Sequence, residues 1–379
     1  MPHLSLWAGK GHRRVWESCP YSARCRDAPS PRQMRAKTVC SAQKCAAPLT
    51  LWSECMLPKD ITIDYYDASR DESGVLAAWH SAFGDQFRID ERALRAVAHT
   101  DGPYRAGEHF VARHADQIVG FVFTQLVKPL DEPLSGSLCA VGVARSHWRQ
   151  GIGRALVSTA CESIQQAGGQ QARLGGHVPR FFCGVPDCLP AAMDFFVAQG
   201  FAIHNEQNRV WDLTHDLTTY QTPPQLEARI RESRLTIRTA EPEDYADVIA
   251  FHAREFRNWQ PEYEYFIRVG DGRDILLARD ESGAIVGTLI MFMPRSHQLR
   301  GDVIWWAELG EPLGSLAAVG VGEAGRGKGI GAALVARGTA FLKAQGVRVA
   351  HIGWTGVPEF YEKAGYRRWQ SFLGGWRVL

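Results

Sequence analysis

The chain has 379 residues with a formal net charge of +2, and 45% of its residues are hydrophobic and 22% charged. That composition is typical of a soluble globular protein, and the length leaves room for two domains of ordinary size. The balanced charge argues against a nucleic-acid or membrane-surface partner, and no apolar run approaches the ~20 residues of a membrane helix, so we expect a cytoplasmic protein.

The first 56 residues differ in composition from the remainder. They contain nine Lys or Arg residues against three acidic ones (Glu17, Asp27 and Glu54), hence a charge of +6, and five of the nine cysteines. The cysteine spacings match no common zinc motif, and the apolar segment of a secretory signal is missing, although the low acid content also fits a transit peptide. We expect residues 1–58 to be a disordered basic leader or a segment upstream of a true start at Met56.

Residues 59–214 show the pattern of one α/β unit. Apolar and polar residues alternate over 61–66, as in a half-buried strand, and the glycine pair at 168–169 is typical of a helix C-terminus. The expected elements are a strand at 61–66, helices near 69–83 and 90–99, strands at 108–115 and 117–127, a strand, loop and helix over 137–167, a strand ending at 173–176, a proline-rich segment at 177–190, a helix at 191–201 and two closing strands.

Residues 215–233 are polar and contain Pro223-Pro224, so we predict a linker there. Residues 234–379 then repeat the order of the first unit. The expected elements are a strand at 235–240, helices at 241–256 and 261–269, strands at 274–280 and 283–293, a long loop, a strand, loop and helix over 315–345, a strand at 347–354, a helix at 358–366 and one or two closing strands. Each half is predicted to be an α/β domain with a mixed, mainly antiparallel sheet flanked by helices.

One glycine-rich stretch occurs in both halves. SLCAVGVARSHWRQGIGRALV (137–157) and SLAAVGVGEAGRGKGIGAALV (315–335) align without a gap, 178 positions apart. Each reads as a strand, a polar loop with close-set glycines, and a helix. Backbone N–H groups at a helix N-terminus bind phosphate oxygens well, and glycine allows the backbone to approach them closely. The repeat therefore indicates a duplicated fold in which each half holds a phosphorylated ligand.

The second copy resembles the acyl-CoA-binding signature of the GNAT superfamily of N-acetyltransferases: Arg or Gln, two residues, Gly, one residue, then Gly or Ala. The strand LAAVGV and the later segment FYEKAGY (360–366) extend the resemblance, which covers residues 60–379 as two tandem domains. It implies acetyl-CoA as the acyl donor. The residues that it assigns to acyl-CoA are Val319, Val321, Arg326, Gly327, Lys328, Gly329, Ile330 and Gly331 in the second half, and Val141, Val143, Arg149, Gln150, Gly151, Ile152 and Gly153 in the first.

The resemblance also implies roles for the strand before the loop. The N–H of Val319 polarises the thioester carbonyl, and Val321 pairs with the pantetheine arm. Such a donor contributes about 3 kcal/mol of transition-state stabilisation. Alternatively the AVGV run is only a buried strand, and for Val141 and Val143 the two interpretations stand equally.

The two halves differ at the implied site. Arg326 aligns with Trp148 of the first half, where the backbone donors nevertheless survive. Tyr361 stands where the family often has a general acid that protonates the departing CoA thiolate, whereas the first half has Phe196 there. A core aromatic is the alternative interpretation of Tyr361. We predict a catalytic C-terminal half and a degenerate N-terminal half.

No cysteine follows Cys188, so the second half cannot form a thioester on a cysteine of its own, and direct attack by an amine is the simpler mechanism. A general base then takes the amine proton. Glu308 and Glu311, in the loop before the second copy, are the candidates, with solvated surface glutamates as the alternative. Trp305 and Trp306 either wall an acceptor pocket or simply pack.

Cys183 and Cys188 are separated by four residues and lack nearby His or Cys partners, so we predict no metal site. The segment FFCGVP (181–186) is expected to cover an edge of the acceptor cleft or to contact the other half.

The predicted function is acetyl transfer from acetyl-CoA to a primary amine of a small molecule or peptide by direct attack. A non-catalytic acyl-CoA-binding or sensing module is the alternative. No charge cluster points to a particular acceptor. We expect a monomer or homodimer, because two fused copies can already supply the contact that single-domain relatives obtain by dimerising.

Overall fold

The computed structural model describes residues 57–98, 105–128, 133–296 and 303–379. Residues 1–56 of the predicted leader, Met56 included, lie outside these ranges, and residues 57–379 group as one unit. No helix among the described residues has the length and apolar character needed to cross a membrane.

The first sheet contains the strands of the N-terminal half and one strand from the C-terminus. Among the described strands of this sheet, only β5 and β6 pair in parallel, over three residues. Within the described residues its order is β1 (Ile61–Tyr65), β3 (Phe110–His114), β4 (Gln117–Val127), β5 (Ser135–Val143), β6 (Gln171–Leu174), β16 (Gly375–Val378) and β8 (Ala202–Ile203), with β2 (Arg105–Ala106) beside β4. Its helices are α1 (Ala68–Phe83), α2 (Glu91–Ala98), α3 (Ile152–Gln166) and α4 (Pro190–Ala198).

The second sheet repeats this plan. In the part of this sheet that the structure describes, only β13 and β14 pair in parallel. Its order in the described part of the chain is β10 (Thr236–Thr239), β11 (Ile275–Arg279), β12 (Ile285–Phe292), β13 (Leu313–Val321), β14 (Val349–Thr355), β9 (Val210–Asp216), β15 (Arg367–Leu373) and β7 (Val185–Pro186). Its helices are α5 (Pro224–Glu232), α6 (Tyr245–Glu255), α7 (Gln260–Arg268), α8 (Trp306–Leu309), α9 (Ile330–Ala344) and α10 (Pro358–Glu362). The predicted fold, two mixed and mainly antiparallel sheets flanked by helices, is confirmed.

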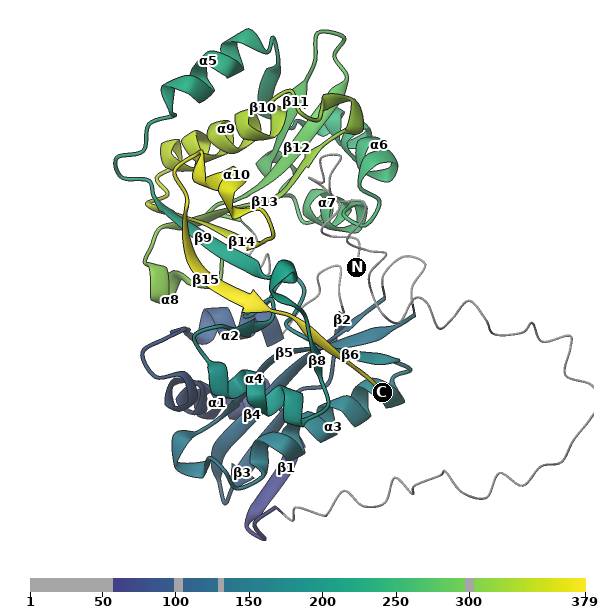
Figure 1. Ribbon diagram of the computed structural model, residues 1–379, viewed down its shortest axis with the longest axis vertical. Coiled ribbons are helices and arrows are strands. Elements are labelled where there is room, and N and C mark those ends of the chain that lie inside the picture. The colour runs from purple at the N-terminus through teal and green to yellow at the C-terminus, as the bar shows by residue number, and fades with distance from the viewer. Residues whose placement is uncertain (1–56, 99–104, 129–132, 297–302) are drawn as a thin grey trace, which may run out of the picture. The chain divides into compact units, whose positions relative to one another are not determined.

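The two halves exchange strands. β9 and β7 precede the second half in sequence, yet β9 pairs with β14 and β15, and β7 pairs with β15. In return β16, at the end of the chain, inserts between β6 and β8 (Figure 1). Residues 181–186, expected at the cleft or between halves, thus end in a strand of the second sheet. Within the predicted linker 215–233 the chain forms α5, whose Glu227 is ion-paired with Arg337 of α9 at 3.1 Å.

One ion pair is part of the repeat. Asp71 of α1 contacts Arg113 of β3 at 2.6 Å, and Asp244, which precedes α6, contacts Arg279 of β11 at 2.8 Å. Both carboxylates are buried. For Asp71, burial opposes ionisation, but hydrogen bonds from Arg70 and Arg113 outweigh it and lower the pKa to about 2. The pair fixes the first helix of each half against its sheet.

Candidate functional site

The glycine-rich loop of the second half joins β13 to the N-terminus of α9. Gly327 and Gly329 have φ of +77° and +81°, a left-handed conformation that other residues adopt at a cost. A Cβ built at either glycine would meet no non-neighbouring atom within 4 Å. Arg326 and Lys328 are exposed beside them. The loop thus offers an open, positively charged surface at a helix N-terminus, which fits the diphosphate of a CoA molecule.

The strands β13 and β14 separate beside this loop. They pair only over Leu313–Ser315, although β13 continues to Val321. Beyond Ser315 the edge of β13 that faces β14 is therefore free of ladder hydrogen bonds to it. We call this region the fork of the second half. An extended amide chain such as pantetheine can pair with such an edge.

The opposite edge of β13 carries a bulge at the level of the fork. Thr288 of β12 pairs with Gly320 and Ile290 pairs with Ala317, so Ala318 and Val319 together oppose one residue of β12. Ala318 has a left-handed φ of +48°. The Ala318–Val319 peptide, whose N–H is the predicted oxyanion donor, therefore lies outside the regular ladder.

The first half keeps the backbone shape of the loop. Gly151 has φ +84° and Arg149 has φ +63°, and these residues align with Gly329 and Gly327. The left-handed conformation is thus retained at both positions, even where an arginine has replaced the glycine.

Trp148 also takes over one contact of the arginine with which it aligns. Its Nε1–H donates to the carbonyl of Val143 at 2.6 Å, and the Nε–H of Arg326 donates to the equivalent carbonyl of Val321 at 3.4 Å. Each side chain links the loop to the end of the preceding strand. Trp148 therefore replaces the hydrogen bond of the arginine but not its charge.

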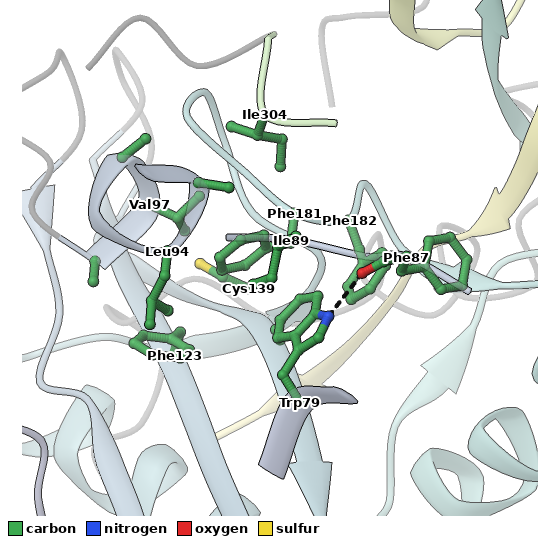
Figure 2. Close-up of a cluster of buried hydrophobic side chains, with 14 of the residues drawn as sticks. Trp79, Phe87, Ile89, Leu94, Val97, Phe123, Cys139, Phe181, Phe182 and Ile304 are labelled. Carbon is green, nitrogen blue, oxygen red and sulfur yellow. Dashed lines mark hydrogen bonds between the residues drawn. The ribbon is translucent and has the colours of Figure 1, made fainter. Parts of the chain in front are cut away.

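The interior of the first half contains a cluster of aromatic side chains around Trp79. The ring of Trp79 lies against Phe121, Phe181 and Phe182, with centroid distances of 5.5, 4.6 and 5.8 Å. Its indole N–H donates to the carbonyl of Phe87 at 2.8 Å (Figure 2). Trp79 and Phe121 are completely buried, and the other three rings are 5% exposed or less.

Tyr361 lies on α10, half-buried beside Phe360 and Tyr366. Burial raises the pKa of its phenol, so the hydroxyl stays protonated over the physiological range. A protonated hydroxyl can give a proton, as a general acid must. Phe196, its equivalent in the first half, contacts the corresponding aromatic residues Phe195 and Phe201 but carries no hydroxyl.

Glu308 and Glu311 contact the first half. The carboxylate of Glu308 accepts hydrogen bonds from the backbone and side chain of Arg88, at 3.1 and 3.2 Å. Glu311 is ion-paired with Arg92 at 3.0 Å. Either carboxylate can accept a proton only by weakening its ion pair, so a structural role accompanies any chemical one.

The neighbouring tryptophans belong to the same contact. Trp305 is buried against Phe87 and Phe182 of the first half. Trp306 donates its indole N–H to Asp90 at 2.9 Å. These contacts support the interpretation that Trp305 and Trp306 pack against the first half rather than wall an acceptor pocket.

The exchanged strand β9 brings a histidine–aspartate pair to the closed end of the fork. His351 of β14 is the register partner of Ser315, and its Nε2 lies 3.4 Å from Oδ2 of Asp212. Asp212 also accepts the backbone N–H of Trp354 at 2.8 Å. Burial opposes ionisation of Asp212, but the contacts with His351, Arg180 and this N–H outweigh it and lower its pKa. Sequence reasoning missed the pair because its members come from different halves.

Cys183 and Cys188 are free thiols, and burial raises the pKa of both. Among the described residues no group of three or more His, Cys, Asp or Glu side chains is placed to hold a metal ion.

Comparison with known proteins identifies the repeated unit. The family model described as "Acetyltransferase (GNAT) family" matches residues 75–201 and again 236–366. Mycothiol acetyltransferase of Thermobispora bispora is 28% identical over 321 residues, which cover 82% of this chain and 97% of that protein. Mycothiol acetyltransferase of Nocardia farcinica is 28% identical over 264 residues, or 68% and 76% of the two chains.

Solved structures show the same two-domain arrangement. A GCN5-related glucosamine N-acetyltransferase region of a fungal multi-domain GH3 β-N-acetylglucosaminidase superposes with a TM-score of 0.78 at 32% identity, covering 84% of this chain. The match spans only 38% of that longer fungal protein. A tandem GNAT protein from the clavulanic acid biosynthesis pathway has a TM-score of 0.61 at 16% identity, over 84% of this chain and 98% of the other, and shows the fold alone.

Proposed function

The chain belongs to the acetyltransferase (GNAT) family and is an N-acetyltransferase, and we propose that its C-terminal half transfers the acetyl group of acetyl-CoA to a primary amine. The observation that carries this proposal is the contrast between the halves. The second half combines an open glycine loop, a fork and a bulge with a left-handed residue. The first half keeps the loop and a similar fork, because β5 and β6 pair over only three residues, but no described residue of its β5 is left-handed, and Trp79 packs there against aromatic neighbours.

The proposed reaction is a direct transfer. The amine nitrogen attacks the thioester carbonyl, and the N–H of Val319 stabilises the oxyanion, an effect of about 3 kcal/mol for a well-placed donor. Collapse of this intermediate breaks the C–S bond. Tyr361 gives its proton to the departing thiolate, and the products are CoA and the N-acetyl amide. Val321 pairs with pantetheine, while residues 326–331 hold the diphosphate.

A base takes the proton that the amine loses. Glu308 and Glu311 remain the proposed candidates, and the pair of His351 with Asp212 is a third, because it lies at the closed end of the fork. Any of these groups would act through a water molecule. Glu308→Gln, Glu311→Gln and His351→Asn are compared by pH profile. In the variant that lacks the base, kcat/KM should no longer fall with decreasing pH as it does in the wild type. The other two variants should keep that decrease.

We propose that the first half binds CoA without turning it over. Its loop residues 149–153 keep the left-handed positions that present backbone N–H groups. Phe196, in place of the tyrosine, has no proton to donate. The amides of Val141 and Val143 are the proposed contacts for pantetheine.

The acceptor that we propose is the amine of an amino sugar, with glucosamine as the first compound to test. The fungal region named as a glucosamine N-acetyltransferase is 32% identical to this chain and superposes on it with a TM-score of 0.78. A mycothiol-related amine is second, since two relatives carry the name mycothiol acetyltransferase.

The test is an acceptor assay with the purified chain and acetyl-CoA. Thiol release is followed together with the mass of the acetylated product, and N-acetylglucosamine, whose amine is blocked, is the matched control. We expect CoA release and a mass gain of about 42 Da with glucosamine, at a rate of about 1–10³ s⁻¹, and neither with the control. Calorimetric binding of acetyl-CoA without CoA release for any amine would instead support the acyl-CoA-binding module.

A further inference from the structure

A chain of buried hydrogen bonds ends on the bulge of β13. Nε2 of His252 lies 3.0 Å from Oγ1 of Thr288, and the hydroxyl of Tyr263 lies 3.1 Å from the same Oγ1. That tyrosine hydroxyl also lies 3.0 Å from the carbonyl oxygen of Ala318. His252, Thr288 and Tyr263 come from α6, β12 and α7, and all three are completely buried.

The hydrogen positions follow from elimination. A carbonyl oxygen only accepts, so the hydroxyl of Tyr263 donates to Ala318. The same hydroxyl is also directed at Oγ1 of Thr288, so the two acceptors share its proton, and Thr288 also accepts Nε2–H of His252. Nδ1 of His252 has no partner among the described residues, and a buried lone pair costs less there than a buried N–H. Burial lowers the pKa of His252 to about 3, which keeps the ring neutral as this arrangement requires.

Among its described residues, the first half has no counterpart of these hydrogen bonds. His252 aligns with Trp79, because Asp71 and Phe83 match Asp244 and Phe256 at the same offset of 173. When the IVG motifs at 118–120 and 285–287 are aligned, Phe121 matches Thr288 in the sequence. Two stacked rings thus occupy the place of a hydrogen-bonded pair. The helix α2, with sequence ERALRAVA, has no tyrosine.

The bulge differs between the halves in the same sense. In the first half the register shifts at Cys139, which aligns with Ala317, and no described residue of β5 has a left-handed φ. In the second half the left-handed residue is Ala318, and its carbonyl is the one that Tyr263 holds. The hydrogen-bond chain and the left-handed bulge therefore occur together in one half and are missing together from the described part of the other.

We propose that Tyr263, supported by Thr288 and His252, is a positioning residue for the oxyanion-binding peptide. The carbonyl of Ala318 and the N–H of Val319 belong to one planar peptide unit, so holding the carbonyl also fixes the direction of the N–H. A hydrogen bond to the carbonyl polarises the peptide and makes its N–H a stronger donor. This inference rests on the proposed function, in which that N–H contacts the thioester.

The structure explains why such support is needed. Alanine resists the left-handed conformation, so the bulge peptide would relax if its carbonyl lost its partner. The buried hydroxyl of Tyr263 is that partner, and it reaches the carbonyl from the face of the sheet that packs against α6 and α7. Since the three side chains have no exposed surface, they act on the reaction only through the backbone of β13.

The first experiment is Tyr263→Phe in the full chain. We expect kcat to fall roughly five- to tenfold, as for one lost hydrogen bond, with little change in the KM of acetyl-CoA. Tyr220→Phe is the matched control, because this buried tyrosine also donates to a backbone carbonyl, that of Ala336 in α9, away from the bulge. It should lose comparable thermal stability and retain kcat.

The second experiment reads the thioester directly. Acetyl-CoA labelled with ¹³C at the acetyl carbonyl is bound to each protein, and the ¹³C shift reports polarisation of that carbonyl. We expect a downfield shift on binding to the wild type and to Tyr220→Phe, and a smaller one with Tyr263→Phe and Thr288→Val. Thr288→Ser keeps the hydroxyl and should restore the wild-type shift.

The outcomes separate this inference from the proposed function. If the wild type acetylates an amine but Tyr263→Phe keeps both kcat and the carbonyl shift, the positioning role is wrong and the acetyltransferase activity stands. If no acetyl-CoA binding is detected in the wild type, the proposed function fails first. If Tyr220→Phe loses as much kcat as Tyr263→Phe, the loss reflects general destabilisation of the fold, and the inference is wrong.

Discussion

At the scale of single residues, the halves diverge most clearly where one side chain provides or lacks a proton. Tyr361 and Phe196 occupy equivalent positions in similar aromatic surroundings. Their difference is one hydroxyl, and burial raises the pKa of that hydroxyl so that it remains protonated. At this position the chemical difference between the halves thus comes down to one oxygen atom.

Tyr361→Phe is expected to lower kcat about 100-fold, the lower end of the range for general acid catalysis. Phenylalanine fits the same space, so the melting temperature should change by only a few degrees. Steady-state kinetics and thermal unfolding provide the measurements. Phe196→Tyr serves as the control and should add no activity. A Tyr361→Phe enzyme with wild-type kcat would show that the residue only packs.

Asp71 makes stability depend on pH. Its folded-state pKa, about 2, lies below the ordinary value of 3.8, so the stabilisation is present above pH ~4 and disappears as pH falls through about 2. Asp71→Asn should therefore lose about 2 kcal/mol of unfolding free energy at pH 7. Urea unfolding at pH 7 and pH 3 checks this, since the deficit should shrink at the lower pH.

The control for this prediction is Asp64→Asn. Asp64 also contacts Arg113, at 3.1 Å, but its side chain is 49% exposed. A surface ion pair contributes less than about 1 kcal/mol, so this variant should change little at either pH. Equal deficits for Asp71→Asn at both pH values would contradict the assignment.

At the scale of elements, the two glycine loops share a shape but differ in their surroundings. The loop conformation is set by local left-handed positions, and these survive in both halves. What surrounds the loop, including the fork, the bulge and the interior packing, depends on strands and helices that are distant in sequence. A duplicated motif can therefore keep its backbone conformation while the residues around it differ.

Gly329→Ala tests the contribution of the loop in the second half. With φ at +81°, alanine should cost about 1 kcal/mol, which corresponds to a roughly fivefold rise in the KM of acetyl-CoA. The matched control is Gly151→Ala, with φ +84° in the first half. If catalysis resides in the second half, the control leaves KM unchanged. The opposite result would assign turnover to the first half.

Most elements could be predicted from the sequence, because the type of a helix or strand depends on local periodicity. The strand partners could not. Residues 210–216 have the alternating pattern of a strand, but nothing local says that they pair with β14 of the other half. The loop residues around Gly329 were also predictable from the glycine motif. The group formed by His252, Thr288 and Tyr263 was not, since its members lie on separate elements and only the fold brings them together.

At the scale of the whole molecule, neither half has a complete sheet of its own. β16 supplies the link between β6 and β8 in the first sheet, while β9 supplies the link between β14 and β15 in the second. The contacts of Arg88 with Glu308 and of Arg92 with Glu311 join the halves further. The two GNAT units therefore depend on each other for stability.

Removing residues 375–379 should destabilise the first half. The truncation exposes the edges of β6 and β8, and the lost ladder bonds amount to on the order of 3 kcal/mol. Thermal unfolding should show a lower melting temperature, and hydrogen exchange should accelerate at residues 171–174. Trp376→Ala keeps the backbone of β16 and serves as the control. Unchanged exchange at 171–174 after truncation would mean that β16 contributes little.

The position of β16 also has a consequence for biosynthesis. The ribosome completes β8 at Ile203 but does not reach Gly375 until 172 positions later. At roughly 5–20 residues per second, the first sheet waits about 10–35 s for its missing strand. During that interval β6 and β8 present open edges, which other nascent chains can pair with. A strand that follows the second half in sequence thus closes the first sheet, so maturation of the N-terminal half is tied to synthesis of the C-terminal half.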